Sequence, residues 1–378
     1  MEQTDEEQLL SVLGNPLLRF FAGTAWGGGG SASVLVVAAS AIASGMAETV
    51  LVFRSRARGK QSSYGKDPKQ GGRYWEKLAT SLPGLNQWHV PQGLVSAFQE
   101  MAMISMRHRI EYGTTDDQYA DVAIAFREHA MRNPNAVMRA PMTREDHHAS
   151  RMISDPLRLY DCNIETDGAV AFIVTSVERA RDLRQPPAVI LAGAMAAGSH
   201  HIRLSTMFER EWEEESPVRV AKQLYEMAGV KPREVGAAFF YDFFTSLVII
   251  GLEQYGFAPR GEGGPFAENG GLSWQGGRLP CNTNGGQLSA SNAETWTQWG
   301  TVLKGLKWML QADAPLLVNP APTLHKMRWM AEFLSNIPHY KRNTVETVRL
   351  AISARAVLFE MARSEERRVG KECLRLCR

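Results

Sequence analysis

The chain has 378 residues, of which 44% are hydrophobic and 22% are charged, so it can bury a large core and has room for about two or three domains. Its formal net charge of +2 is too small to indicate nucleic acid or an anionic membrane surface as a partner. Its four cysteines do not form a disulfide framework and its acidic start is unlike a signal peptide, so we expect a reducing, cytoplasmic location.

The first predicted elements form a unit of strand, turn, helix and strand. Leu18–Thr24 predicts a short buried strand, and the glycines Gly27–Gly30 predict a turn. Ser31–Ser44 predicts a helix that is apolar on nearly all faces and therefore packed on several sides. The continuous apolar run Glu48–Ser55 predicts a strand in a parallel sheet covered on both faces. The longest apolar run, Val34–Phe53, is interrupted by polar residues, so no membrane span is expected.

Further strands and helices alternate along the chain and favour an α/β fold. Residues 55–160 are less regular and predict an inserted loop domain, with a clear helix over Thr115–Met131. A second helix is predicted with Ser216 as its N-cap and Gly229 as its stop. Strands followed by a helix or turn are predicted at Gly168–Leu183, Pro187–Gly198 and Gly236–Phe257.

The composition changes near residue 300. After Trp299 the chain is rich in Trp, Met, Leu and Arg, and the pattern predicts helix without strands. The change predicts a boundary between a strand-containing body and a helical tail, residues 301–378.

Three separated stretches resemble the thiolase superfamily, and within it the sterol-carrier or lipid-transfer type. They are residues 111–183, 241–271 and 279–294, and the resemblance runs in order over about residues 1–300. It implies two similar α/β halves, residues 1–186 and 187–300, whose sheets stack around buried central helices. It also implies a homodimer and a site for an acyl-CoA or lipid thioester at the ends of those helices.

The resemblance places the nucleophilic cysteine of the family near Gly28, yet no cysteine lies between Gly27 and Ser33. Thiolysis needs a thiolate that accepts the acyl group, so the covalent route is closed here. Losing the nucleophile of a coupled pair costs about six orders of magnitude in rate. Ser31 or Ser33 could replace it, but a serine before an apolar helix is more often an N-cap. Gly28 is retained as a candidate substrate contact.

A second family element is a Gly-Gly loop followed by a histidine that binds the thioester oxygen. Here the resemblance assigns Asn284, Gly285 and Gly286 to the loop as substrate contacts, and the histidine position falls on Asn292. An asparagine can donate a hydrogen bond to an oxyanion, worth about 3 kcal/mol when well placed, but it cannot transfer a proton at neutral pH.

A third family element corresponds to residues 241–244, "YDFF". Tyrosine at this position is typical of the thiolase-like aldolases, in which Tyr241 would act as an acid or base in carbon–carbon cleavage. The alternative is that Tyr241 and Phe243 are core aromatic residues. Asp242 is a candidate substrate contact, or it caps the helix that follows.

The other reactive residues suggest no further chemistry. His147–His148 and His200–His201 are adjacent pairs whose side chains point in different directions, so neither pair predicts a metal site. Cys162 and Cys281 are predicted to be small buried hydrophobes. The opening glycines match neither a dinucleotide fingerprint nor a phosphate loop, and we expect no cofactor apart from acyl-CoA as substrate.

Both ends depart from the family. Family members begin with a strand-helix-strand unit before the segment that resembles residues 4–21 here, which implies a truncated first sheet. Residues 301–363 resemble an interior helical segment of FAD-dependent D-amino-acid dehydrogenases, without the flavin motif, and residues 364–373 resemble translated adaptor DNA. A chimeric, non-functional reading frame is one hypothesis, and a flavin dehydrogenase is another that depends on the tail alone.

Two functional hypotheses remain for residues 1–300. The first is an enzyme of lipid or steroid side-chain metabolism that cleaves a β-hydroxyacyl-CoA by a retro-aldol reaction, or transfers an acyl group, together with an OB-fold partner subunit. The second is an inactive subunit that binds acyl-CoA, lipid or only a partner protein. Asn292 discriminates between them, because an aromatic residue or histidine there would be a better proton donor.

Overall fold

The computed structural model describes only part of the chain, and every structural statement below refers to that part. The described residues are 11, 13–14, 17–23, 30–56, 90–94, 96–164, 166, 168–183, 188–196, 212–290, 316–318, 351–353 and 356–361. The helices are α2 (Gly30–Ala43), α5 (Ala97–Tyr112), α6 (Asp116–Arg132), α7 (Arg144–Ala149), α8 (Val177–Ala180), α9 (Ser216–Ala228), α10 (Thr245–Gln254) and α11 (Gly263–Ala267). The strands are β1 (Thr49–Arg56), β2 (Met152–Ser154), β3 (Leu157–Arg158), β4 (Gly168–Thr175), β5 (Ala188–Ile190), β6 (Ala237–Phe239), β7 (Leu316–Val318), β8 (Ala351–Ser353) and β9 (Ala356–Met361).

The predicted helix and strand at the start of the chain are confirmed as α2 and β1, each within about a residue of its expected bounds. The strand's partner corrects the prediction of a parallel sheet. β1 pairs with β4 in antiparallel register along its whole length, from Thr49 opposite Thr175 to Arg56 opposite Gly168. A continuous apolar run shows that a strand is covered, but it carries no information about the direction of its partner.

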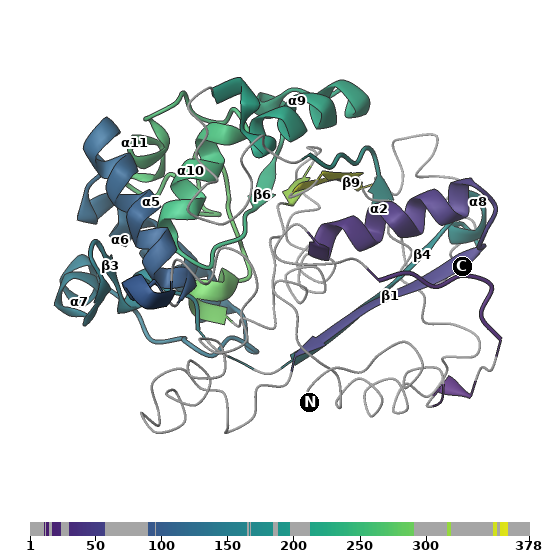
Figure 1. The fold of residues 1–378 in the computed structure, drawn as a ribbon, viewed down its shortest axis with the longest axis horizontal. Helices are drawn as coiled ribbons and strands as arrows, with labels where there is room; N and C mark the ends of the chain where they lie inside the picture. The colour runs from purple at the N-terminus through teal and green to yellow at the C-terminus, as the bar shows by residue number, and fades with distance from the viewer. Residues whose placement is uncertain are drawn as a thin grey trace.

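Helix α2 lies along this two-stranded ribbon (Figure 1). Leu35, Ala38 and Ala41 are buried, whereas Ser40 and Ala43 are exposed. Helix α2 also contacts β8, which belongs to the sheet of β5, β6, β7 and β9. The described part of α2 therefore packs against two sheets, as predicted, although Ser40 and Ala43 remain exposed.

The predicted strand Leu18–Thr24 is absent from the residues that are described there. Residues 17–23 form an irregular, mostly exposed segment, in which the Phe21 side chain is 73% exposed. The Arg19 guanidinium lies 3.9 Å from the Glu48 carboxylate at the surface. An apolar run forms a strand only where a neighbouring edge pairs with its backbone, and no described strand pairs with this segment.

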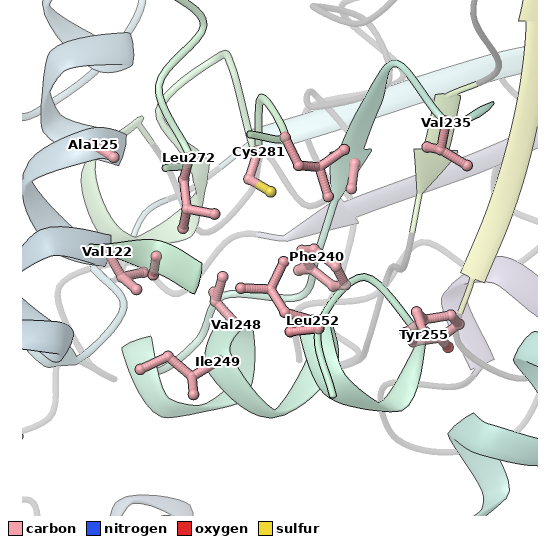
Figure 2. Packing of buried hydrophobic residues seen from close by; sticks show 14 of the residues in the cluster. Val122, Ala125, Val235, Phe240, Val248, Ile249, Leu252, Tyr255, Leu272 and Cys281 are labelled. Atoms are coloured by element: carbon pink, nitrogen blue, oxygen red, sulfur yellow. The ribbon is translucent and has the colours of Figure 1, made fainter. Parts of the chain in front are cut away.

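The main core surrounds α10, which follows β6 after a short connection. Val248, Ile249, Ile250 and Leu252 of this helix are all at most 2% exposed. Helices α6, α9 and α11 contact it (Figure 1). Figure 2 shows side chains of β6, α6 and the Gly-rich region converging on its apolar surface. Helix α10 is thus a further buried helix of the predicted fold.

The helix boundaries follow the sequence signals closely. Helix α6 begins after Thr115, whose Oγ1 accepts a hydrogen bond from the Gln118 amide at 3.3 Å. Helix α9 ends at Gly229, which has the left-handed φ of 66°. Its first helical residue is Ser216 and its N-cap is Glu215, so the predicted cap was one residue late.

The described residues of the tail are strands, which corrects the expectation of a tail without strands. β7 pairs with β6 in parallel, and β9 pairs with β5, β7 and β8 in antiparallel register. A short apolar run fits a buried strand as well as a turn of a buried helix. Here the pairing of β9 with β5 and of β7 with β6 fixes these runs as strands. None of the helices among the described residues is both long enough and apolar enough to cross a lipid bilayer.

Candidate active site

The connection from β6 to α10 carries Tyr241 and Asp242, and a side chain distant in sequence fixes its start. The Asn282 amide binds both backbone polar groups of Phe240: Phe240 N donates to Asn282 Oδ1 at 2.7 Å, and Asn282 Nδ2 donates to Phe240 O at 2.8 Å. Asn282 itself has a φ of +45°, a conformation that asparagine tolerates better than most residues. Asn282 was not among the predicted site residues, although an Asn in a Gly-rich turn is a signal for this role.

Tyr241 is 6% exposed and lies in an apolar cluster with Phe243, Met101 and Ile250. Its ring stacks on Phe243, with 4.3 Å between the ring centroids and 26° between the ring planes. The predicted alternative that both aromatic residues pack in the core is confirmed. Packing fixes the position of the Tyr241 ring and does not conflict with a chemical role for its hydroxyl group.

Asp242 is fully buried and contacts the Gly-Gly loop. Its Oδ2 accepts a hydrogen bond from the Leu288 amide at 3.1 Å, in the helical turn η6 (Gly286–Ala290). A Cβ on Gly286 would overlap the same carboxylate oxygen. The structure therefore brings Asp242 and Gly286 together.

The alternative role of Asp242 as a helix cap is wrong. The N-cap of α10 is Phe244, which makes no side-chain capping hydrogen bond. The carboxylate of Asp242 instead binds the amide of Leu288. The hydrogen bond from the distant Leu288 amide occupies the carboxylate oxygen that a local capping motif would have used as its acceptor.

The Gly-Gly loop is held by its own asparagine and by α6. The Asn284 side chain accepts a hydrogen bond from the Gly286 amide at 3.1 Å, and its backbone carbonyl accepts one from Asn133 Nδ2 at 3.0 Å. Gly285 and Gly286 have φ values of 104° and 61°, which L residues with a side chain rarely adopt. A Cβ on Gly285 would overlap Ala130 of α6. The glycines are thus required by backbone conformation and by close packing.

Two predicted site residues, Gly28 and Asn292, lie outside the described residues, as does the pair His200–His201. Within the described part, no group of three or more His, Cys, Asp or Glu side chains is arranged to hold a metal ion. The geometry that can be stated is therefore that of Tyr241, Asp242 and the loop Asn284–Gly286.

Comparison with known proteins places this geometry in a family. Residues 196–298 match the domain described as thiolase C-terminal domain-like. A steroid side-chain-cleaving aldolase of Thermomonospora curvata is 41% identical over 273 residues, which cover 72% of this chain and 68% of that protein. The chain belongs to the thiolase superfamily.

Two further similarities extend this thiolase-superfamily assignment. A 17-hydroxy-3-oxo-4-pregnene-20-carboxyl-CoA lyase of Mycobacterium tuberculosis is 37% identical over 290 residues, which cover 76% of this chain and 74% of that protein. A solved structure described as Ltp2-ChsH2(DUF35) aldolase covers 97% of this chain and 86% of its own, with a TM-score of 0.75 and 30% identity. The predicted superfamily and its α/β fold are confirmed.

A short part of the chain has a different relative, as predicted. D-amino acid dehydrogenase 3 of Mesorhizobium japonicum is 66% identical over 82 residues, which are 22% of this chain and 20% of that protein. The similarity confirms that this thiolase-superfamily chain also carries a segment like the D-amino-acid dehydrogenases. The proposed resemblance of residues 364–373 to adaptor DNA and the division into the three domains 1–186, 187–300 and 301–378 stay predictions.

Neither described cysteine can replace the nucleophile that thiolases use. Cys281 is fully buried in the main core, and this burial raises the pKa of its thiol well above the ordinary value. Cys162 has a raised pKa for the same reason, and its Sγ donates to the Arg158 carbonyl at 3.3 Å. The reactive form of a cysteine is the thiolate, so both are predicted to be inert.

This inertness can be measured by alkylation. In the folded chain at neutral pH, we expect iodoacetamide to leave Cys281 unmodified, because its thiol is both inaccessible and protonated. In denaturing urea the same cysteine should be alkylated, as read by peptide mass spectrometry. Rapid modification of Cys281 in the folded chain would contradict the structure of this core.

His129 of α6 binds the Gly-rich region at Trp274 and is expected to make the free energy of unfolding depend on pH. Burial lowers its pKa from 6.5 to about 4, partly offset by the backbone carbonyls of Asn282 and Cys281. Its Nε2 accepts a hydrogen bond from the Trp274 amide at 3.1 Å, which fixes Nε2 as the unprotonated atom of a neutral ring.

The folded state therefore binds this proton less readily than the unfolded state. The contribution of neutral His129 to stability is fully present above pH 6.5 and is lost as the pH falls towards 4. At about 1.4 kcal/mol per pKa unit, the free energy of unfolding should decrease by about 3 kcal/mol over this window. Urea unfolding at several pH values gives the free energy of unfolding of the wild type and of His129→Gln as a function of pH. If this free energy depends on pH equally in both proteins, the role of His129 is contradicted.

Proposed function

We propose that this chain is a thiolase-superfamily aldolase that cleaves a β-hydroxyacyl-CoA, with a steroid side-chain thioester as the substrate class. The observation that carries the proposal is the contact between the Tyr241–Asp242 connection and the Gly285–Gly286 loop in a chain with no cysteine near Gly28. The 41% sequence identity to a steroid side-chain-cleaving aldolase supports the same reaction class.

The proposed chemistry is a retro-aldol cleavage. A base takes the proton of the β-hydroxyl group, the bond between the α and β carbons breaks, and the β carbon becomes a ketone or aldehyde. The electron pair of that bond forms the enolate of the CoA thioester, and the α carbon then takes up a proton. No electrons pass to an acceptor and no covalent acyl-enzyme forms, so the missing cysteine is consistent with this reaction and we include no redox cofactor.

Each site residue then has a proposed role. Tyr241 acts as the acid or base, because it is the phenol on the connection that packing holds in place. Asn292 and the loop Asn284–Gly286 would contact the thioester oxygen, where negative charge develops on forming the enolate. Gly28 and Asp242 complete the substrate-binding side of the site, Asp242 by holding the loop.

The proposal includes a second subunit. The similar solved structure is described as Ltp2-ChsH2(DUF35) aldolase, which supports the predicted OB-fold partner for this chain. A homodimer of this chain remains part of the proposal by resemblance. A soluble complex without nucleic acid or a membrane span is the expected form of the enzyme.

The test is product formation. The full chain, with and without an OB-fold partner, is incubated with a β-hydroxyacyl-CoA that carries a tertiary hydroxyl group, and products are identified by mass spectrometry. The expected products are a ketone and the shortened acyl-CoA in equal amounts. Binding of the thioester without any product would instead support the alternative of a non-catalytic subunit.

A further inference from the structure

A line of hydrogen-bonded side chains connects the interior near the site with the surface. Asp161 Oδ1 accepts a hydrogen bond from His147 Nε2 at 2.8 Å. His147 Nδ1 lies 3.4 Å from His148 Nδ1, and His148 Nε2 lies 2.7 Å from Asp117 Oδ1. Asp161 and His147 are at most 1% exposed, whereas the side chains of His148 and Asp117 are 35% and 55% exposed.

Asp161 uses its remaining hydrogen bonds to hold two elements. Its Oδ1 also accepts a hydrogen bond at 2.7 Å from the hydroxyl group of Thr245, the first residue of α10. Its Oδ2 accepts from the Arg158 amide at 2.7 Å. Three donors on one fully buried carboxylate fix its orientation.

Residues 161–164, which we call the tie segment, connect the two loops of the site. The Asn163 amide donates to the Phe243 carbonyl at 2.9 Å. The Ile164 amide donates to the Gln287 carbonyl at 3.0 Å. One short segment thus binds both the connection that carries Tyr241 and the turn that follows the Gly-Gly loop.

We propose that His147 is a positioning residue of this site: its Nε2 donates to Asp161, orients that carboxylate, and thereby holds the tie segment against both loops. Its effect on turnover rests on the proposed function, but its effect on the tie segment does not.

Hydrogen–deuterium exchange of the full chain tests the proposal without requiring activity. In His147→Ala, the protection of peptides that contain residues 161–164 should fall about ten- to hundred-fold, as expected when a hydrogen bond to a charged group is lost. His147→Gln keeps a donor towards Asp161 and should restore most of this protection.

Two further variants keep the test decisive. His148→Ala changes a partly exposed residue that binds Asp117 rather than Asp161, so the chain should fold and keep most of the protection of residues 161–164. His108→Ala is the matched control, because His108 is an equally buried histidine that binds Glu253 and Thr114 instead. It should leave the protection of residues 161–164 unchanged.

The outcomes separate the two proposals. Unchanged protection in His147→Ala, or an equal loss in His108→Ala, would overturn the role of His147. A wild type that forms no product but shows the expected exchange pattern would count against the proposed function alone. In an active wild type, a loosened tie segment with an unchanged kcat/KM would show that His147 does not position the site.

Discussion

Tyr241→Phe is expected to reduce the rate of retro-aldol cleavage by about 10²- to 10⁴-fold, the usual contribution of a positioned acid or base. The substitution removes only the hydroxyl oxygen, and the ring can keep its stacking on Phe243 at a centroid distance of 4.3 Å. We therefore expect the loss in kcat with little change in the affinity for the CoA thioester. Product formation followed by mass spectrometry, together with acyl-CoA titration, measures both quantities.

Tyr119→Phe is the matched control for this substitution. Tyr119 is also buried, and its hydroxyl donates to the Ser105 carbonyl at 3.3 Å, away from the proposed reacting groups. Its loss should lower the free energy of unfolding by about 1 kcal/mol, as for one hydrogen bond, and leave the rate unchanged. If Tyr241→Phe cleaves the substrate as fast as the wild type does, the role proposed for Tyr241 is wrong.

Gly286→Ala is expected to lower the free energy of unfolding by about 2–5 kcal/mol. A left-handed conformation costs an L residue about 1–2 kcal/mol, and overpacking a tight contact adds about 1–3 kcal/mol. The backbone of Gly286 has a φ of +61°, and the new Cβ would overlap the Asp242 carboxylate. To relieve the overlap, Asp242 would have to move from the Leu288 amide, which would also displace the connection that carries Tyr241.

Gly276→Ala separates the two costs. Gly276 has a similar φ of +73°, but a Cβ there would meet no atom within 4 Å. Its substitution should therefore cost only about 1–2 kcal/mol from the backbone conformation. Urea unfolding of both variants gives the comparison. Equal destabilisation would mean that the contact between Gly286 and Asp242 contributes nothing measurable.

The sequence predicted the site residues that belong to short motifs. Tyr241, Asp242 and the loop Asn284–Gly286 stand in two stretches whose order and spacing resemble the thiolase superfamily. Their local roles also followed from residue type, since a left-handed turn requires glycine and a missing thiolate excludes thiolysis. The structure shows that both stretches meet, through the Leu288 amide and the Asp242 carboxylate.

The residues that the sequence did not reveal act through contacts across the fold. Asp161 binds Thr245, which is 84 residues away in the chain, and Asn282 binds the backbone of Phe240, 42 residues away. A single carboxylate or amide has no pattern that distinguishes it from a surface residue. Its role is decided by burial and by the donors that the fold brings to it.

The sequence by itself determined the family, the missing nucleophile and the positions of most helices. Periodicity, caps and glycines depend only on residues that are close together in the sequence, so they can be recognised without the tertiary structure. Tertiary structure alone decided that β1 pairs antiparallel with β4 and that Asp242 binds Leu288 instead of capping a helix. In each case several local solutions are possible, and the packing of distant segments selects among them because a buried polar group or apolar face must find its partner.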